Sequence, residues 1–366
     1  MTVIGKVVSL AAAAFALALA STASAKPPQT VVEAVRERAV QAGFDGSILI
    51  GEADGRYAVI TTGNAPVAAD AVWRWASITK QLAVVLAMQE VAAGRLDLDA
   101  PVSRYWPDWK AKNAQTTKIR HLLLHNSGLP QPDQSPADSD GVPAFYRSNA
   151  VSPQESAASF CAGAPRADAP AEYEYNNCDS IVLAEVLARV TGKPFDTLVR
   201  HRFARKLRMK TLGMFGMGAP VHPHVKPIGE FANVDPLLNM GVYGASGGAY
   251  GTITDLWKFD RALLSGKLVP TKVRELMWRS TRENGFYGFF QWIYPAPLAG
   301  CDKPVRIVER QGLIGGIELR NYLFPESGRG VILFSRKRPT ELGDPWEGKG
   351  YSFDMLSAAI CRKENK

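Results

Sequence analysis

The sequence has 366 residues, of which 46% are hydrophobic and 21% are charged. This composition excludes a small disulfide module and a low-complexity chain, and it provides enough apolar residues for one large domain or two ordinary ones. The 43 Lys and Arg residues exceed the 35 Asp and Glu residues by 8, but they are scattered along the chain. We therefore expect no nucleic-acid partner, because such proteins concentrate basic residues in runs or stripes.

The first 25 residues have the pattern of an export signal. Lys6 precedes the apolar segment 7–20, and Ala-Ser-Ala at 23–25 supplies the small residues of a cleavage site. The alternative is a membrane anchor, for which the apolar run is too short and too rich in alanine. We expect a signal peptide over 1–25 and an exported chain, periplasmic or secreted, with no stable membrane insertion after cleavage.

The mature chain begins with one helix and two strands. Helical spacing of apolar residues predicts a helix over 31–42, and short apolar runs predict strands over 46–50 and 57–62. The Asp-Gly turn at 54–55, between β-branched residues, indicates a hairpin.

Helices dominate the middle of the chain. Apolar spacing predicts helices over 81–93 and 180–190, and Gly192 and Pro194 end the second one. The segment 131–153 is rich in Pro, Ser and Asp, which predicts a long loop.

The C-terminal part returns to strands, at 305–309, 317–324 and 330–334, and closes with a helix over 352–361. Early and late strands therefore enclose a helical middle. We expect a single α/β (α+β) domain over 26–366, with its sheet region at about 26–75 and 240–366 and a helical region inserted at about 76–239.

The chain has four cysteines, which suit an oxidising compartment and allow three pairings. A bond between Cys161 and Cys178 would close a short loop, and one between Cys301 and Cys361 would hold the C-terminal helix. We expect at least one disulfide. No Cys-x-x-Cys sequence occurs, so a zinc or thioredoxin-like site is not indicated.

The sharpest chemical pattern is Ser77-Ile78-Thr79-Lys80, at the start of a helix. Positions three apart share a helix face, so the Ser77 hydroxyl and the Lys80 amine can meet. A serine becomes a good nucleophile when a base accepts its proton, and a desolvated lysine is such a base. Taken alone, Ser-x-x-Lys also arises by chance on solvated helix faces.

Further segments make the pattern specific. In chain order they are Trp73-Arg74-Trp75-Ala76 before Ser77, the stretches 94–107 and 119–129, Tyr175-Asn176-Asn177, Ser246-Gly247-Gly248 and Tyr287-Gly288-Phe289. Together they resemble the class C β-lactamase and D-alanyl-D-alanine carboxypeptidase family, with its related esterases and D-aminopeptidases, over roughly 43–340. The resemblance implies a β-lactamase/transpeptidase-like fold, with an antiparallel sheet flanked by helices, and no cofactor.

The resemblance also implies roles for particular residues. Ser77 would be the nucleophile, Lys80 its proton partner, Tyr175 the second member of the acid/base pair and Asn177 a polar contact to Lys80 and the substrate. A phenol is a good base when a neighbouring ammonium favours the phenolate. Positioned proton transfer contributes about 10²–10⁴ in rate.

The third family element is a strand that carries a cation, usually Lys or His, followed by any residue and a glycine. Its best match is Arg310-Gln311-Gly312, which is a departure because arginine cannot serve as a proton donor. We expect Arg310 to bind a substrate carboxylate, Gly312 to let the substrate backbone approach, and the N–H of Leu313 to join that of Ser77 in an oxyanion hole. The alternative is a solvated strand arginine. Strand alternation places Arg310 and Gly312 on one face and Glu309 and Gln311 on the other.

Two other motifs compete. The sequence Gly-Ala-Ser-Gly-Gly at 244–248 spells the nucleophile elbow of α/β-hydrolases, but all five histidines precede Ser246, which is the wrong order. We expect this segment to be a loop that lines the cleft. The pairs His121 with His125 and His222 with His224 could bind a metal, but no glutamate completes a zincin pattern, and we expect no metal.

Three functions remain as hypotheses. The favoured one is an exported serine acyl hydrolase that acts through an acyl-enzyme on an ester, a D-amino-acid peptide or a β-lactam. Its substrate would be a small molecule or a cell-wall peptide. The second is a non-catalytic relative that binds cell-wall peptide or a protein partner, and the third is a metal-dependent hydrolase.

Overall fold

The computed structural model describes residues 28–147, 151–216, 224–229, 232, 238–280, 283, 285–337 and 342–361. The expected signal peptide and His222 lie outside these ranges. Within them, no helix is both long enough and apolar enough to cross a membrane.

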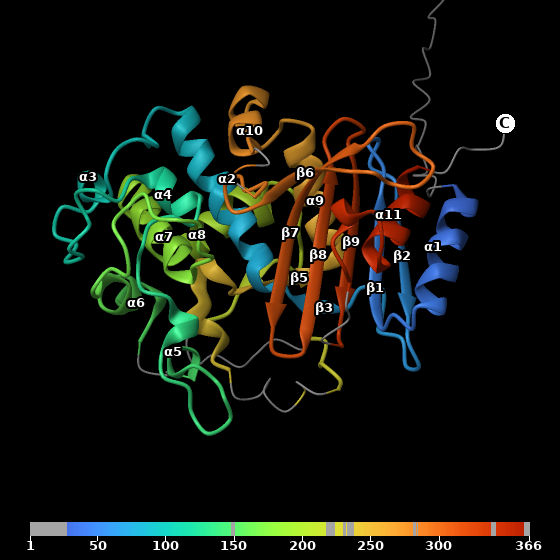
Figure 1. Cartoon of the computed structure of the whole chain (residues 1–366), viewed down its shortest axis with the longest axis horizontal. Helices are drawn as coiled ribbons and strands as arrows, with labels where there is room; N and C mark the ends of the chain where they lie inside the picture. Colours follow the sequence, from blue (N-terminus) through green and yellow to red (C-terminus); the bar gives the residue numbers. More distant parts are fainter. Residues whose placement is uncertain are drawn as a thin grey trace, which may run out of the picture.

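The centre of the molecule is an antiparallel sheet of six strands in the order β2-β1-β9-β8-β7-β6 (Figure 1). From one edge to the other, the strands are β2 (Tyr57–Thr62), β1 (Gly46–Gly51), β9 (Arg329–Ser335), β8 (Ile317–Phe324), β7 (Val305–Ile314) and β6 (Trp292–Ala296). The N-terminal hairpin pairs directly with the last strand, and Ile48 lies opposite Leu333. The prediction of one sheet built from both chain ends is confirmed.

The strands differ from the prediction in two places. Strand β7 continues to Ile314 because Arg310, Gln311 and Gly312, which interrupt the apolar run, still pair with β8. Strand β6 was not predicted. It contains Pro295, which lacks an N–H, and such a strand is tolerated at the edge of a sheet. A second, unpredicted sheet contains β3 (Val72–Arg74), β5 (Ala249–Thr252) and β4 (Gly213–Met214).

Helices cover both faces of the large sheet, which explains why every residue of β8 is buried. Helices α1 (Gln29–Gln41) and α11 (Tyr351–Ile360) pack on one face, over Ile48 and Ile307. Helices α2 (Thr79–Ala92) and α9 (Ile253–Leu264) belong to the core on the other face. Figure 1 shows α2 on the β7 side of the sheet, away from α1, whereas α9 contacts β9 and β1.

The remaining helices are short apart from α7 (Asn177–Thr191), which packs on α2. They are η1 (Ala76–Ile78), α3 (Val102–Tyr105), α4 (Ile119–Leu123), η2 (Pro132–Gln134), α5 (Ala144–Arg147), α6 (Pro153–Ala158), η3 (Phe160–Ala162), α8 (Phe195–Val199), η4 (Arg200–Arg205), η7 (Met240–Ser246), α10 (Thr271–Met277) and η8 (Pro345–Glu347). The segment predicted as a long loop, 131–153, therefore includes two helical turns, η2 and α5, and the start of α6.

Two disulfides are present, Cys161–Cys178 and Cys301–Cys361. The first joins η3 to the beginning of α7, and the second joins the segment after β6 to the end of α11. The expectation of at least one disulfide is confirmed, and this is one of the three possible pairings.

Candidate active site

Ser77 lies in η1, the single turn that connects β3 to α2. The residue before it, Ala76, has a φ of +46°, in the left-handed region that non-glycine residues rarely adopt. Such a conformation costs about 1–3 kcal/mol and is held by its surroundings. Here the Thr79 hydroxyl donates to the Ala76 carbonyl over 2.6 Å, and the buried Trp75 indole donates to the Gly251 carbonyl over 3.1 Å. These two hydrogen bonds attach the backbone next to the predicted nucleophile to the start of α2 and to β5.

Three predicted residues meet in one chain of short contacts. The Ser77 Oγ lies 2.6 Å from the Tyr175 hydroxyl oxygen, and that oxygen lies 2.6 Å from the Lys80 Nζ. The direct distance from Lys80 Nζ to Ser77 Oγ is longer, 3.4 Å. A proton can therefore pass from serine to lysine by two short steps through the phenol.

Lys80 is fully buried and is held by two further acceptors. Its Nζ donates to the Asn177 Oδ1 at 2.6 Å and to the Ser246 carbonyl at 2.8 Å. Burial and, next, the positive charge of Arg310 hold the pKa of Lys80 well below its usual range, although Asp133 and Asp179 oppose this. A lowered pKa favours the neutral amine, which can accept a proton, so Lys80 is suited to act as a base.

The pKa of Tyr175 is shifted in the opposite direction, upwards. Burial raises the pKa of its phenol, and this effect exceeds the lowering by the charge of Arg310 and the hydrogen bond from Ser77. The sequence interpretation, in which an ammonium at Lys80 maintains a Tyr175 phenolate, is therefore not the arrangement that this environment favours. A protonated phenol beside a neutral amine fits the site better, and Tyr175 then relays the proton.

Arg310 enters the site from β7 and is 2% exposed. Its Nη2 donates to the Tyr175 hydroxyl at 2.9 Å, its Nε to the Ser77 carbonyl at 3.0 Å and its Nη1 to the Phe290 carbonyl at 3.0 Å. The predicted alternation is confirmed, since the neighbouring Glu309 contacts Arg320 at 2.8 Å. The alternative of a solvated strand arginine is wrong, because the guanidinium is buried and contacts the nucleophile and its partner. Arg310 also lines the cavity, so binding of a substrate carboxylate stays a prediction.

Gly312 also has a different neighbour from the one expected. A Cβ there would lie 2.9 Å from the Trp75 carbonyl and 3.3 Å from the Ala76 Cβ. The glycine thus lets β7 approach η1, and it is not among the residues that line the cavity. Leu313 does line the cavity and is 38% exposed.

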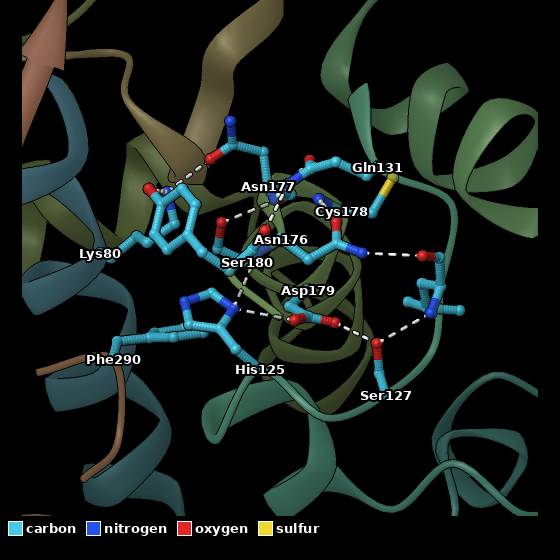
Figure 2. A network of polar contacts seen from close by, with 12 residues as sticks. Lys80, His125, Ser127, Gln131, Asn176, Asn177, Cys178, Asp179, Ser180 and Phe290 are labelled. Atoms are coloured by element: carbon cyan, nitrogen blue, oxygen red, sulfur yellow. Dashed lines mark hydrogen bonds and ion pairs between the residues drawn. The ribbon is translucent and has the colours of Figure 1, made fainter. Parts of the chain in front are cut away.

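The segment from Tyr175 to Asn177 is held by the preceding loop. The Gln131 side chain donates to the Tyr175 carbonyl and accepts from the Asn177 N–H at 3.3 Å. Asn176 caps α7, since its side chain accepts from the Cys178 N–H at 2.8 Å. Figure 2 shows these amides around the start of α7, with Asn177 directed at Lys80. Sequence analysis did not single out Gln131, because nothing in a polar loop distinguishes the side chain that turns inward.

Figure 2 shows a buried polar cluster in which His125 and Ser127 both contact Asp179. The His125 Nδ1 lies 2.8 Å from the Asp179 Oδ2, and Ser127 donates to the other oxygen of that carboxyl group. Burial raises the pKa of Asp179 well above its usual range and lowers that of His125 well below its own. The His125 ring packs on the Tyr175 ring with 4.8 Å between centroids. Through this ring contact, the cluster helps to hold the Tyr175 side chain in position.

The two competing motifs, the histidine pairs and the segment 244–248, do not form the sites that their sequences suggest within the described residues. The His121 Nδ1 accepts from the Lys118 N–H at 3.1 Å, at the start of α4. Among the residues that the structure describes, no group of three or more His, Cys, Asp or Glu side chains has the arrangement of a metal site. The Ser246 hydroxyl is buried and donates to the Tyr243 carbonyl at 2.6 Å. Ser246 therefore contributes its carbonyl to Lys80, and the neighbouring Tyr243 lines the cavity.

Ser77 opens into a cavity of about 570 Å³. The lining residues are Ser77, Asp133, Asp140, Gly141, Val142, Pro143, Tyr146, Tyr175, Asn177, Leu238, Tyr243, Trp292, Arg310, Gln311, Leu313, Ile314 and Gly315. They come from η1, the loop before α5 and α5 itself, the segments around the start of α7 and η7, and strands β6 and β7. Asp133, Tyr146 and Trp292 were not predicted, because their positions in this wall depend on contacts between distant chain segments.

Known proteins resemble this chain in sequence and in fold. PbpX, a Bacillus subtilis protein named for the penicillin-binding proteins, is 25% identical over 71% of this chain and 60% of its own length. Esterase EstB of Burkholderia gladioli is 30% identical over 40% of each chain. A D-stereospecific amidohydrolase from Streptomyces sp. has the same fold, with a TM-score of 0.71 and 23% identity over 92% of this chain and 99% of its own. The matches thus span about half the length of the two sequence relatives.

A family model described as Beta-lactamase matches residues 31–346, most of the chain. The match covers the nucleophile region, the Tyr175 segment and strand β7 in one continuous stretch. The expected β-lactamase/transpeptidase-like fold is also confirmed, by the antiparallel sheet with helices on both faces. The chain belongs to the beta-lactamase family, whose relatives are serine hydrolases.

Proposed function

We propose that this chain is an exported serine acyl hydrolase that works through a covalent acyl-enzyme on Ser77. The observation that carries the proposal is the pair of 2.6 Å contacts that link Ser77 Oγ, the Tyr175 hydroxyl and Lys80 Nζ beside a cavity. These contacts support the hydrolase over a non-catalytic binding relative, because each member of the acid/base chain is in place. The leader pattern at 1–25 supports export.

In the first step, Ser77 Oγ attacks the carbonyl carbon of an ester or amide. Its proton passes to the Tyr175 oxygen while the phenolic proton passes to the neutral Lys80 amine. The negative charge on the carbonyl oxygen is stabilised by the N–H groups of Ser77 and Leu313, the assignment that the family resemblance implies. The tetrahedral intermediate then collapses, and the proton returns through Tyr175 to the departing oxygen or nitrogen.

In the second step, water replaces the leaving group. Lys80 and Tyr175 remove a proton from the water as its oxygen attacks the acyl carbon. The bond to Ser77 Oγ breaks, and the serine recovers its proton by the same path. The balance is one water consumed and one acid and one alcohol or amine released.

The substrates that fit best are small esters and amides, including peptides of D-amino acids. A cavity of about 570 Å³ suits a small molecule. The names of EstB and of the Streptomyces enzyme point to ester and D-amide chemistry. A β-lactam carries a carboxylate, and the cation expected to receive it, Arg310, donates to three protein oxygens instead. We therefore consider β-lactams weaker candidate substrates than esters and amides.

A fluorophosphonate tests the proposal, because it phosphonylates activated serines. Intact-mass measurement should find one adduct on the mature protein and none on Ser77→Ala. The Ser246→Ala variant is the matched control and should keep the adduct, because its hydroxyl donates to the Tyr243 carbonyl. No adduct on folded wild-type protein would contradict the proposal and favour a binding function. Loss of ester hydrolysis on treatment with a chelator would favour the metal-dependent alternative.

A further inference from the structure

The carboxylate of Asp133 faces the cavity beside the nucleophile. Its Oδ1 accepts hydrogen bonds from the Tyr146 hydroxyl and, at 3.4 Å, from the Asn177 Nδ2. No salt bridge to Asp133 occurs within the described part of the chain, and its Oδ2 has no hydrogen-bond partner there. One oxygen is thus held in place by the protein, and the other is available to a ligand.

This carboxylate lies close to the reacting groups. Asn177, which donates to Asp133, accepts from Lys80 at 2.6 Å with its other amide atom. The negative charge of Asp133 is near enough to raise the pKa of Lys80 and of Tyr175. A ligand group that pairs with Asp133 would therefore lie near the scissile carbonyl, at the Ser77 end of the cavity.

The other charged residues of the cavity wall, Asp140 and Arg310, already have hydrogen-bond partners within the protein. Asp140 forms an ion pair with Arg147 at 2.5 Å. Arg310 donates to Tyr175, to the Ser77 carbonyl and to the Phe290 carbonyl. Asp133 is consequently the one carboxylate of the cavity wall without a basic partner among the described residues, whereas the guanidinium of Arg310 is hydrogen-bonded to neutral oxygens at the nucleophile.

The aromatic wall next to Asp133 also favours a cation. Tyr146, whose hydroxyl donates to Asp133, stacks on Tyr243 with 4.4 Å between ring centroids and 7° between the planes. Trp292 lines the same cavity. The faces of aromatic rings attract ammonium groups, and a carboxylate beside such rings adds an ionic hydrogen bond. Apolar residues complete the wall: Val142, Leu238, Leu313 and Ile314.

We propose that Asp133 makes the enzyme selective for acyl substrates that carry a positively charged amine close to the scissile carbonyl, together with a small apolar or aromatic side chain. Aminoacyl esters and amides have this chemistry. The inference rests on the proposed function for its reaction, but the binding preference can be measured without turnover.

The test uses Ser77→Ala protein, which cannot form the acyl-enzyme. Calorimetric titration at pH 6.5 compares phenylalaninamide, as each enantiomer, with 3-phenylpropanamide, which lacks only the amine. An α-amino group titrates near about pH 8, so it is charged at pH 6.5. We expect at least one enantiomer to bind more than about tenfold tighter than the neutral amide, as an ionic hydrogen bond would give.

Two comparisons assign this preference to Asp133. It should fall below about threefold when Asp133→Asn is added, because asparagine keeps the shape and an acceptor but loses the charge. It should persist in Asp140→Asn, the matched control whose carboxylate is paired with Arg147. If Asp133→Asn does not fold, titration at pH 9.5 substitutes for it, because deprotonation of the ligand amine should abolish the preference.

Equal binding of the two amides to Ser77→Ala, or an unchanged preference in Asp133→Asn, would overturn the proposal. The outcome is separate from that of the fluorophosphonate experiment. If an adduct forms but no amine preference is found, the hydrolase proposal stands and the proposed role of Asp133 is wrong. If an amine preference is found but no adduct forms, the binding role of Asp133 stands and the hydrolase proposal is wrong.

Discussion

Replacement of Arg310 by glutamine separates two roles for this residue. Its Nη2 and the Nζ of Lys80 both bond to the Tyr175 hydroxyl, at 2.9 and 2.6 Å. Two positive charges at most about 6 Å apart repel each other by about 1–3 kcal/mol in a protein site. Since about 1.4 kcal/mol corresponds to one pKa unit, this repulsion lowers the pKa of Lys80 by a measurable amount, in addition to the larger effect of burial.

The sign of the effect follows from the role of Lys80 as a base. Below its pKa the amine is protonated and cannot accept the proton of Ser77, so kcat/KM falls on the acid side. Loss of the Arg310 charge raises the pKa of Lys80, and the acid limb of the kcat/KM profile should move up by roughly one to two pH units. Arg310→Lys, which keeps the charge, should leave the limb close to that of the wild type.

The assay is kcat/KM against pH for a neutral p-nitrophenyl ester and for an ester that carries a carboxylate. Arg310→Gln should shift the limb for both substrates equally. The reasoning would be refuted if the limb stayed in place and only the carboxylate substrate lost activity. Arg310 would then bind the carboxylate, as the strand motif suggested from sequence.

Three further variants test the geometry. Tyr175→Phe leaves only the direct 3.4 Å path between the serine oxygen and the lysine amine, so kcat/KM for esters should fall about 10²–10⁴-fold; a loss below tenfold would contradict the relay. Gly312→Ala places a Cβ 2.9 Å from the Trp75 carbonyl, and urea titration should show a loss of about 1–3 kcal/mol in the free energy of unfolding; wild-type stability would show that the contact relaxes freely. Replacement of Cys161 and Cys178 by alanine opens a loop of 17-residue separation and should cost about 3 kcal/mol by the same titration. A cost below about 1 kcal/mol would mean that the disulfide does not constrain the unfolded chain.

The parts of the site that were predictable depend on local spacing. Ser77 and Lys80 are three residues apart on one helical stretch, so their proximity follows from helix geometry. The sheet built from both chain ends follows from strand patterns in which β-branched residues mark each run. The positions of the strands are properties of short windows, whereas the pairing of β1 with β9 was inferred from the order of the elements along the chain.

The electrostatics of the site were less predictable, because they depend on burial and on partners from distant segments. Tyr175 was expected as a phenolate, but the fold buries it and raises its pKa. Arg310 lines the cavity, but its contacts with the protein were not predicted: strand β7 runs so close to η1 that the guanidinium reaches the Ser77 carbonyl. Asp133 lies in a segment that reads as an ordinary polar loop, and its position depends on Tyr146 and Asn177.

The opposite charges of Arg310 and Asp133 lead to one more prediction about Lys80. Arg310 lowers the pKa of Lys80, and Asp133 raises it. A substrate ammonium paired with Asp133 would cancel the second effect, so the pKa of Lys80 should be lower in the enzyme–substrate complex than in the free enzyme. The acid limb of kcat, which reports the complex, should then lie at lower pH than that of kcat/KM for an aminoacyl ester, and the gap should be smaller for the ester without the amine. If the pH difference between the two acid limbs is the same for both esters, the substrate amine does not reach Asp133. If the difference is found only for the aminoacyl ester, the bound substrate itself lowers the pKa of Lys80 and so favours its basic form.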